Sequence, residues 1–109
     1  MREGTGRTVL CGANAYERKY YFNPRFDTLP DPVKEELHII CVLFTRDAGG
    51  IFTVVLEEDG SVSMETSAKE TDFGYDEIAA GLLVSEIRRK RQALFELLSL
   101  YGQVFSQSP

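Results

Sequence analysis

Residues suited to metal binding or acid–base chemistry are scarce in this chain. The 109 residues include no tryptophan, a single histidine (His38) and two cysteines (Cys11 and Cys41). A lone histidine excludes metal motifs built on two histidines, and two cysteines are too few for the disulfide framework of a small secreted domain. We therefore expect two free thiols in a reducing cytoplasm, with no metal and no cofactor.

Long apolar runs and positive charge are also limited. No stretch approaches the roughly 18 uncharged apolar residues of a transmembrane helix, and residues 1–6 lack the apolar run of a secretory signal. The 12 Lys and Arg residues oppose 17 Asp and Glu residues, a net charge of −5. This charge disfavours general binding to nucleic acid or to an anionic membrane. We expect one domain over residues 8–105, with disordered tails at 1–7 and 106–109.

Four β-prone segments are present. Residues 8–11 and 17–22 read as short strands separated by a turn at 12–15. Residues 51–56 and 61–66 predict a hairpin, because Asp59-Gly60 supplies the positive φ of a tight turn.

A helix is predicted from Pro32 to about Arg46, with Asp31 as its N-cap and a stop at Gly49-Gly50. Its apolar residues share one helical face: Val33, Leu37, Ile40, Cys41 and Phe44. The segment 37–45 is also rich in β-branched and aromatic residues, so a buried strand stays open as the alternative.

The last third of the chain, from Tyr75 to about Phe105, predicts one long helix. Its length of about 45 Å exceeds the diameter of about 34 Å expected for a compact domain of this size. Its distal stripe should therefore overhang the core and pair with a second copy. The predicted dimer seam comprises Leu94, Leu98 and Tyr101.

A basic run, Arg88-Arg89-Lys90-Arg91, interrupts this stripe. Consecutive helical residues point about 100° apart, so the four cations should ring the helix. We expect them to flank the dimer seam, where they would pair with acidic residues of the partner or bind a small anion between the subunits.

Several ordered segments together resemble a family of small, uncharacterised bacterial proteins. They are residues 11–24, from Cys11-Gly12 to Asn23-Pro24, residues 41–44 leading to Gly49-Gly50-Ile51, and residues 75–78. The resemblance covers nearly the whole chain, from about Thr8 to Phe105. It implies a free-standing cytoplasmic domain of unknown function, and it carries over no functional residue.

Candidate catalytic groups are few. A nucleophile would be Cys11, which precedes a glycine, and a base would be His38. We interpret both as structural, because no cationic residue adjoins Cys11 and His38 has no evident partner. The carboxylates at 57–59 and at 72–77 lack the ligand spacing of a calcium loop, so we assign no catalytic and no metal site.

The sequence thus predicts an α+β fold in which a small antiparallel sheet, with the 51–66 hairpin at its centre, packs against two helices. The leading functional hypothesis is a non-enzymatic, homodimeric module that binds a protein or a small anionic ligand. An enzyme using Cys11 or His38 with nearby carboxylates is the alternative. A nucleic-acid accessory protein is the second alternative, and it requires Arg18, Lys19 and residues 88–91 on one continuous face.

Overall fold

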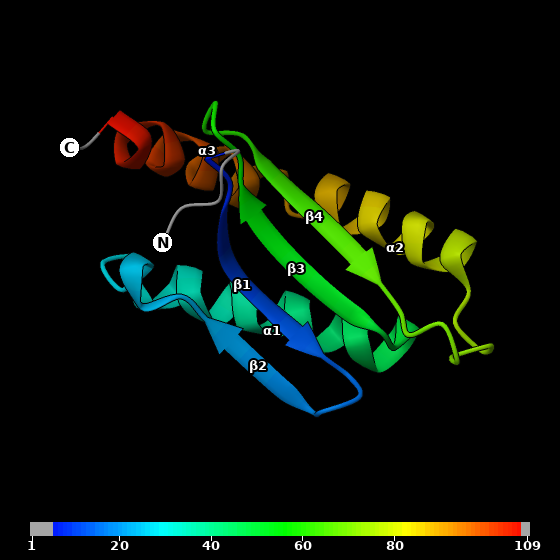
Figure 1. The fold of residues 1–109 in the computed structure, drawn as a ribbon. Coiled ribbons are helices and arrows are strands. Elements are labelled where there is room, and N and C mark those ends of the chain that lie inside the picture. The colour runs from blue at the N-terminus through cyan, green and yellow to red at the C-terminus, as the bar shows by residue number, and fades with distance from the viewer. Residues whose placement is uncertain (1–5, 108–109) are drawn as a thin grey trace.

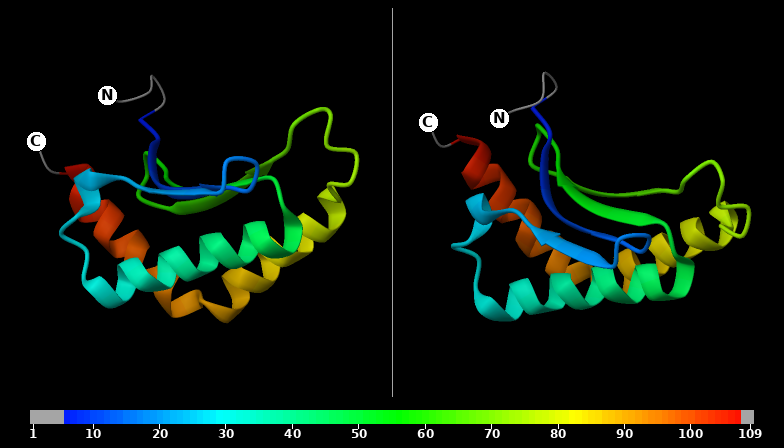
Figure 2. Two further views of the ribbon diagram at one scale, coloured as in Figure 1. Left: turned by 90° about the horizontal axis from the view of Figure 1, so that it is seen from below. Right: turned by 60° about the horizontal axis from the view of Figure 1, so that its bottom comes forward.

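A four-stranded antiparallel sheet carries the helices on one of its faces (Figures 1 and 2). The computed structural model describes residues 6–107. The strands are β1 (Thr8–Asn14), β2 (Lys19–Phe22), β3 (Ile51–Leu56) and β4 (Val62–Ser67). A short 3-10 turn, η1 (Pro24–Phe26), precedes α1 (Asp31–Ala48), and α2 (Glu77–Lys90) and α3 (Gln92–Gln107) follow the sheet. No helix within residues 6–107 is long and apolar enough to cross a membrane.

The strand order is β2-β1-β3-β4, and every neighbouring pair is antiparallel. The connection from β2 to β3 therefore crosses β1, and α1 makes that crossing beneath the sheet (Figure 2). The predicted α+β fold is confirmed. The predicted hairpin is β3–β4, with Gly60 at φ 89° in its turn. Only β3 is central, since β4 forms an edge.

The first strand is longer than predicted. β1 continues through Gly12 to Asn14, and the turn lies at 15–18 instead of 12–15. Gly12 is a strand residue because β3 passes close to it, and a Cβ there would lie 2.8 Å from the Phe52 carbonyl oxygen. The sequence pattern predicted a turn at Gly12, but the glycine is there because two strands approach each other closely.

The first helix is confirmed, and the strand alternative for 37–45 is wrong. All of its predicted core residues are buried against the sheet. The helix begins one residue earlier than predicted: Pro30 occupies the N-cap position and Asp31 is already helical. It ends as predicted at Gly49, whose φ of 77° stops the helix.

The long C-terminal helix is broken, which corrects the sequence-based expectation. Arg91, at φ −113° and ψ 32°, separates α2 from α3, and the change of direction keeps both helices on the sheet (Figure 2). Leu94 is 6% exposed and Leu98 is 1% exposed. The molecule measures 44 × 30 × 21 Å, and neither of these leucines overhangs its core.

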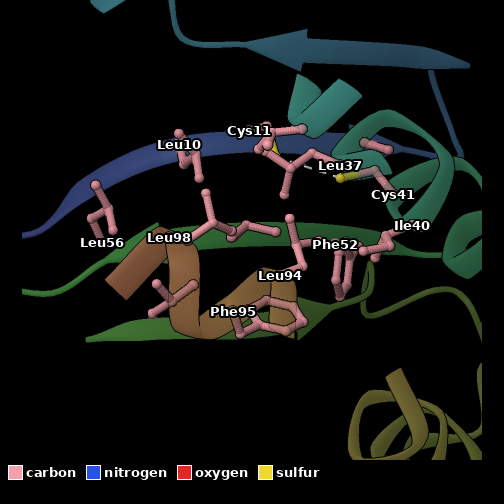
Figure 3. Packing of buried hydrophobic residues seen from close by; sticks show 14 of the residues in the cluster. Leu10, Cys11, Leu37, Ile40, Cys41, Phe52, Leu56, Leu94, Phe95 and Leu98 are labelled. Carbon is pink, nitrogen blue, oxygen red and sulfur yellow. Dashed lines mark hydrogen bonds between the residues drawn. The ribbon is translucent and has the colours of Figure 1, made fainter. Parts of the chain in front are cut away.

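The core lies between the sheet and the helices (Figure 3). Phe44 from α1 and Phe52 from β3 stack with ring centroids 4.5 Å apart. Leu94, Phe95 and Leu98 of α3 pack beneath the sheet (Figure 3). Of the three residues proposed from sequence for a dimer seam, Leu94 and Leu98 therefore belong to the core of the protomer, and Tyr101 is partly buried against it.

The predicted tails fall largely at the margins of the described chain. Residues 1–5 and 108–109, and the side chain of Phe105, lie outside the described part. Arg7, expected in the N-terminal tail, donates hydrogen bonds to Glu57 and to Glu65. At the other end, residues 106 and 107 belong to α3.

Candidate functional site

A pocket opens where the β1–β2 turn faces the C-terminal half of α1. We call it the turn pocket, and its volume of about 390 Å³ lies within the range of sites for small molecules. The turn and its strands provide one wall and α1 provides the other. The lining residues are Ala13, Asn14, Ala15, Arg18, Lys19, Tyr20, His38, Val42, Thr45 and Arg46.

The charged lining of the turn pocket is entirely basic. Arg18 comes from the turn, Lys19 begins β2, Arg46 comes from the last turn of α1, and no Asp or Glu is among the lining residues. Arg46 contacts Asp47, with Nε and Oδ1 3.2 Å apart. Within residues 6–107 the structure records no ion pair for Arg18 or Lys19. In a chain of net charge −5, this is a local concentration of positive charge.

The turn that carries these cations is held in place by hydrogen bonds. The Asn14 side-chain oxygen accepts from the backbone N–H groups of Tyr16 at 2.9 Å and Glu17 at 3.2 Å. The Tyr16 hydroxyl donates to Asp72 at 2.6 Å and accepts from the Lys69 backbone N–H at 3.1 Å. The bond to Asp72 raises the pKa of Tyr16. The loop before α2 therefore fixes the turn.

Arg18 has an unfavourable backbone conformation. It is the one described non-glycine residue with a positive φ, 54°. Glycine or asparagine adopts this region at lower cost than arginine does. Such residues are enriched at functional sites, where the side chain is worth the strain.

An aromatic pair forms the floor of the pocket. Tyr20 from β2 and His38 from α1 stack with their ring centroids 4.2 Å apart. The Tyr20 hydroxyl is buried and has no hydrogen-bond partner within the described residues. Burial, and after it the neighbouring Cys11 and Cys41 thiols, raise the pKa of Tyr20. The floor of the pocket thus offers apolar contact to a ligand, and Tyr20 contributes no charge to it.

The two cysteines lie in the core and not in the pocket. Their sulfur atoms are 3.8 Å apart, and both residues are completely buried (Figure 3). The contact with Cys11, together with burial, raises the pKa of the Cys41 thiol. His38 is exposed and lines the turn pocket, whereas Cys11 does not. The structure does not bring the two catalytic candidates into a shared cleft.

Three of the four cations of the 88–91 run have partners within the described chain. Arg88 donates to the Val62 carbonyl at 2.8 Å and lies over the Phe95 ring. Lys90 pairs with Glu86, and Arg91 pairs with Glu36. Arg89 is the member of the run for which no contact is recorded within the described chain.

The carboxylate clusters have structural partners. Asp76 caps α2 by accepting from the Ile78 and Ala79 backbone N–H groups. Asp59 accepts from both the hydroxyl and the backbone N–H of Ser61. No group of His, Cys, Asp and Glu suited to a metal ion occurs within residues 6–107.

Sequence reasoning identified Arg18, Lys19 and His38 individually but missed Arg46 and Asn14. Arg46 lies far from the turn in sequence, and only the packing of α1 under β1 and β2 brings it to the pocket. The sequence did contain a signal for the pocket: a basic residue lies at the end of the helix, and basic residues lie at the hairpin turn.

The chain matches a protein family over almost its whole length. A model described as a family of unknown function (DUF6145) matches residues 7–108. No curated protein and no solved structure matches the chain. The function must therefore be argued from the chemistry of the turn pocket.

Proposed function

Since the chain belongs to the DUF6145 family, a family of unknown function, we propose from its geometry that it is a non-enzymatic module that binds a small organic anion in the turn pocket. The observation that carries the proposal is the convergence of Arg18, Lys19 and Arg46 on one pocket without an acidic lining residue. Guanidinium groups bind carboxylates and phosphates through paired, charge-assisted hydrogen bonds.

The rest of the pocket indicates the ligand's shape. Val42 and two alanines provide an apolar wall, and the stacked Tyr20–His38 pair provides a flat aromatic surface. A ligand with an anionic group and a planar apolar part would contact both regions at once. We therefore expect an aromatic phosphate or carboxylate to bind more tightly than inorganic phosphate.

The enzyme alternative lacks a positioned pair of groups. Cys11 is sealed in the core beside Cys41, so its sulfur is not accessible to a substrate in solution. His38 reaches the pocket, but its recorded neighbour is the ring of Tyr20 and not a carboxylate or a thiol. A general base needs an orienting partner, so this arrangement favours binding over catalysis.

The nucleic-acid alternative needs a continuous basic face. Arg18 and Lys19 line the turn pocket, whereas Arg88 and Arg89 line a different pocket beside β4 and α3. Arg88 and Arg91 are in addition committed to contacts within the chain. This distribution suits a small anion at one site better than an extended phosphate backbone.

The test is titration calorimetry with phenyl phosphate, with inorganic phosphate for comparison. We expect phenyl phosphate to bind more tightly and the affinity to fall as salt is added. Arg18→Asn and Arg46→Gln should each weaken binding about tenfold or more, because each removes a charge-assisted hydrogen bond. Lys90→Gln, which removes one charge away from the pocket, should leave the affinity unchanged.

Arg18→Asn provides a second readout that generic damage cannot imitate. Asparagine tolerates positive φ better than arginine, so the variant should melt at an equal or higher temperature than the wild type while binding is lost. The proposal would be overturned if neither phenyl phosphate nor inorganic phosphate bound at millimolar concentration. It would also be overturned if Lys90→Gln weakened binding as much as the two pocket variants do.

A further inference from the structure

The outward face of α2 carries an apolar patch that the protomer leaves uncovered. Ile78 is 77% exposed and Leu82 is 68% exposed, one turn apart on the helix. Phe73, in the loop before α2, is 92% exposed and lines the same hollow as Ile78. We call these three residues the α2 patch. The opposite side of the helix is the buried one, where Ala80 contacts the core.

Charges of opposite sign lie near the two ends of α2. Glu77 begins α2, and Arg89 lies one residue before its end. Both are exposed, and at twelve residues apart in sequence they are separated by about 18 Å along the axis. They cannot pair within one helix. A second α2 running antiparallel would place each Arg89 next to a Glu77.

We propose that the α2 patch is a homodimer interface in which two copies of α2 pack antiparallel about a two-fold axis. A two-fold interface must be complementary to itself. A helix with an acid at one end and a base at the other meets this requirement, because each end meets its opposite on the second copy, and the two-fold axis then passes near Leu83, midway between Glu77 and Arg89. Leu82, one residue from that axis, would then pack against Leu82 of the other protomer, whereas Ile78 would lie beside the stem of Arg89.

The surroundings of the patch argue against an anionic membrane as its occupant. Asp72, Asp76 and Glu86 lie around it, and they would repel acidic lipid headgroups. The proposal also replaces the seam expected from sequence, since Leu94 and Leu98 are occupied inside the protomer. It does not rest on the turn pocket, which is lined by other residues.

The first experiment measures molar mass by light scattering across micromolar concentrations, with circular dichroism to establish folding. We expect a wild-type dimer and a folded, monomeric Leu82→Glu variant. Leu100→Glu is the matched control, because Leu100 on α3 is 62% exposed but lies outside the patch; it should remain dimeric. A monomeric wild type, or a dimer lost with Leu100→Glu and kept with Leu82→Glu, would overturn the proposal.

The second experiment reverses the end charges. Glu77→Arg and Arg89→Glu should each raise the dimer dissociation constant at least tenfold, because like charges then meet across the axis. The double variant should recover most of the wild-type affinity. The helix dipole acts within each chain and disfavours both reversals, so it predicts no recovery. Failure of the double variant to recover affinity would refute the antiparallel arrangement.

Discussion

The sulfur atoms of Cys11 and Cys41 lie 3.8 Å apart where β1 meets α1 in the centre of the core. Neither residue is accessible to solvent. The contact with Cys11 and burial both raise the pKa of the Cys41 thiol, so the reactive thiolate is disfavoured. The pair therefore contributes to the packing of β1 against α1, and neither thiol is available to react at the surface.

Both thiols should consequently react slowly with a thiol reagent in the native protein and rapidly after unfolding. The reaction is followed by absorbance at neutral pH with and without denaturant. The native rate should rise with denaturant in step with the unfolded population, since access requires opening of the core. Rapid native labelling of Cys11 would instead restore its candidacy as a nucleophile.

Adjacent leucines on α3 should respond differently to truncation. Leu98 is 1% exposed and Leu97 is 46% exposed. Leu98→Ala should lower the free energy of unfolding by about 2–5 kcal/mol, since it leaves a cavity in the core. Leu97→Ala should cost less than about 1 kcal/mol. Urea unfolding of the two variants measures the difference, and equal costs would contradict the burial of Leu98 and the exposure of Leu97 on α3.

Acid should weaken the link between Arg7 and the sheet. The hydrogen bonds from Arg7, and then one with Ser63, hold the pKa of Glu57 below its usual value of 4.5. Because the folded-state pKa is depressed, this stabilisation is present above that usual value and is lost as the pH falls through the folded-state pKa.

Glu57→Gln should therefore lose less stability than the wild type as the pH is lowered from neutral to below 4.5. The free energy of unfolding in urea, measured at several pH values, provides the comparison. Glu58→Gln is the matched control, because the neighbouring Glu58 is exposed. A wild-type pH dependence in the Glu57 variant would show that this carboxylate contributes nothing to acid sensitivity.

The β3–β4 turn should not tolerate a side chain at Gly60. Its φ is 89°, and a Cβ would lie 2.6 Å from Cγ and 3.1 Å from the backbone nitrogen of Gln103 in α3. Gly60→Ala should destabilise the fold by about 1–3 kcal/mol and also lower the hydrogen-exchange protection of α3.

The control is Gly49→Ala. Gly49 also has a positive φ, 77°, but a Cβ there would meet nothing within 4 Å. We expect it to lower overall stability without a selective loss of protection in α3. Unaltered α3 protection in Gly60→Ala would mean that the turn and the helix are not in close contact.

Local sequence patterns were enough to predict the hairpin and the first helix. The Asp59-Gly60 turn defined the β3–β4 hairpin, because the required positive φ is a property of one residue. Along α1, the spacing of Val33, Leu37 and Phe44 fixed the buried face, and Gly49 fixed its end. Each of these features depends on residues that lie within a few helical turns, or within one hairpin, of each other.

Other features depend on contacts between segments that are distant in the sequence. An apolar stripe has the same period in a straight helix and in two helices joined at Arg91, so only packing on the sheet could reveal the break. That break turned Leu94 and Leu98 into core residues and left Ile78 and Leu82 of α2 on the surface. The turn pocket likewise exists only because α1 crosses beneath β1 and β2 and brings Arg46 to Arg18 and Lys19. Charges far apart in sequence form one site when the chain path places them together, and no local pattern encodes that path.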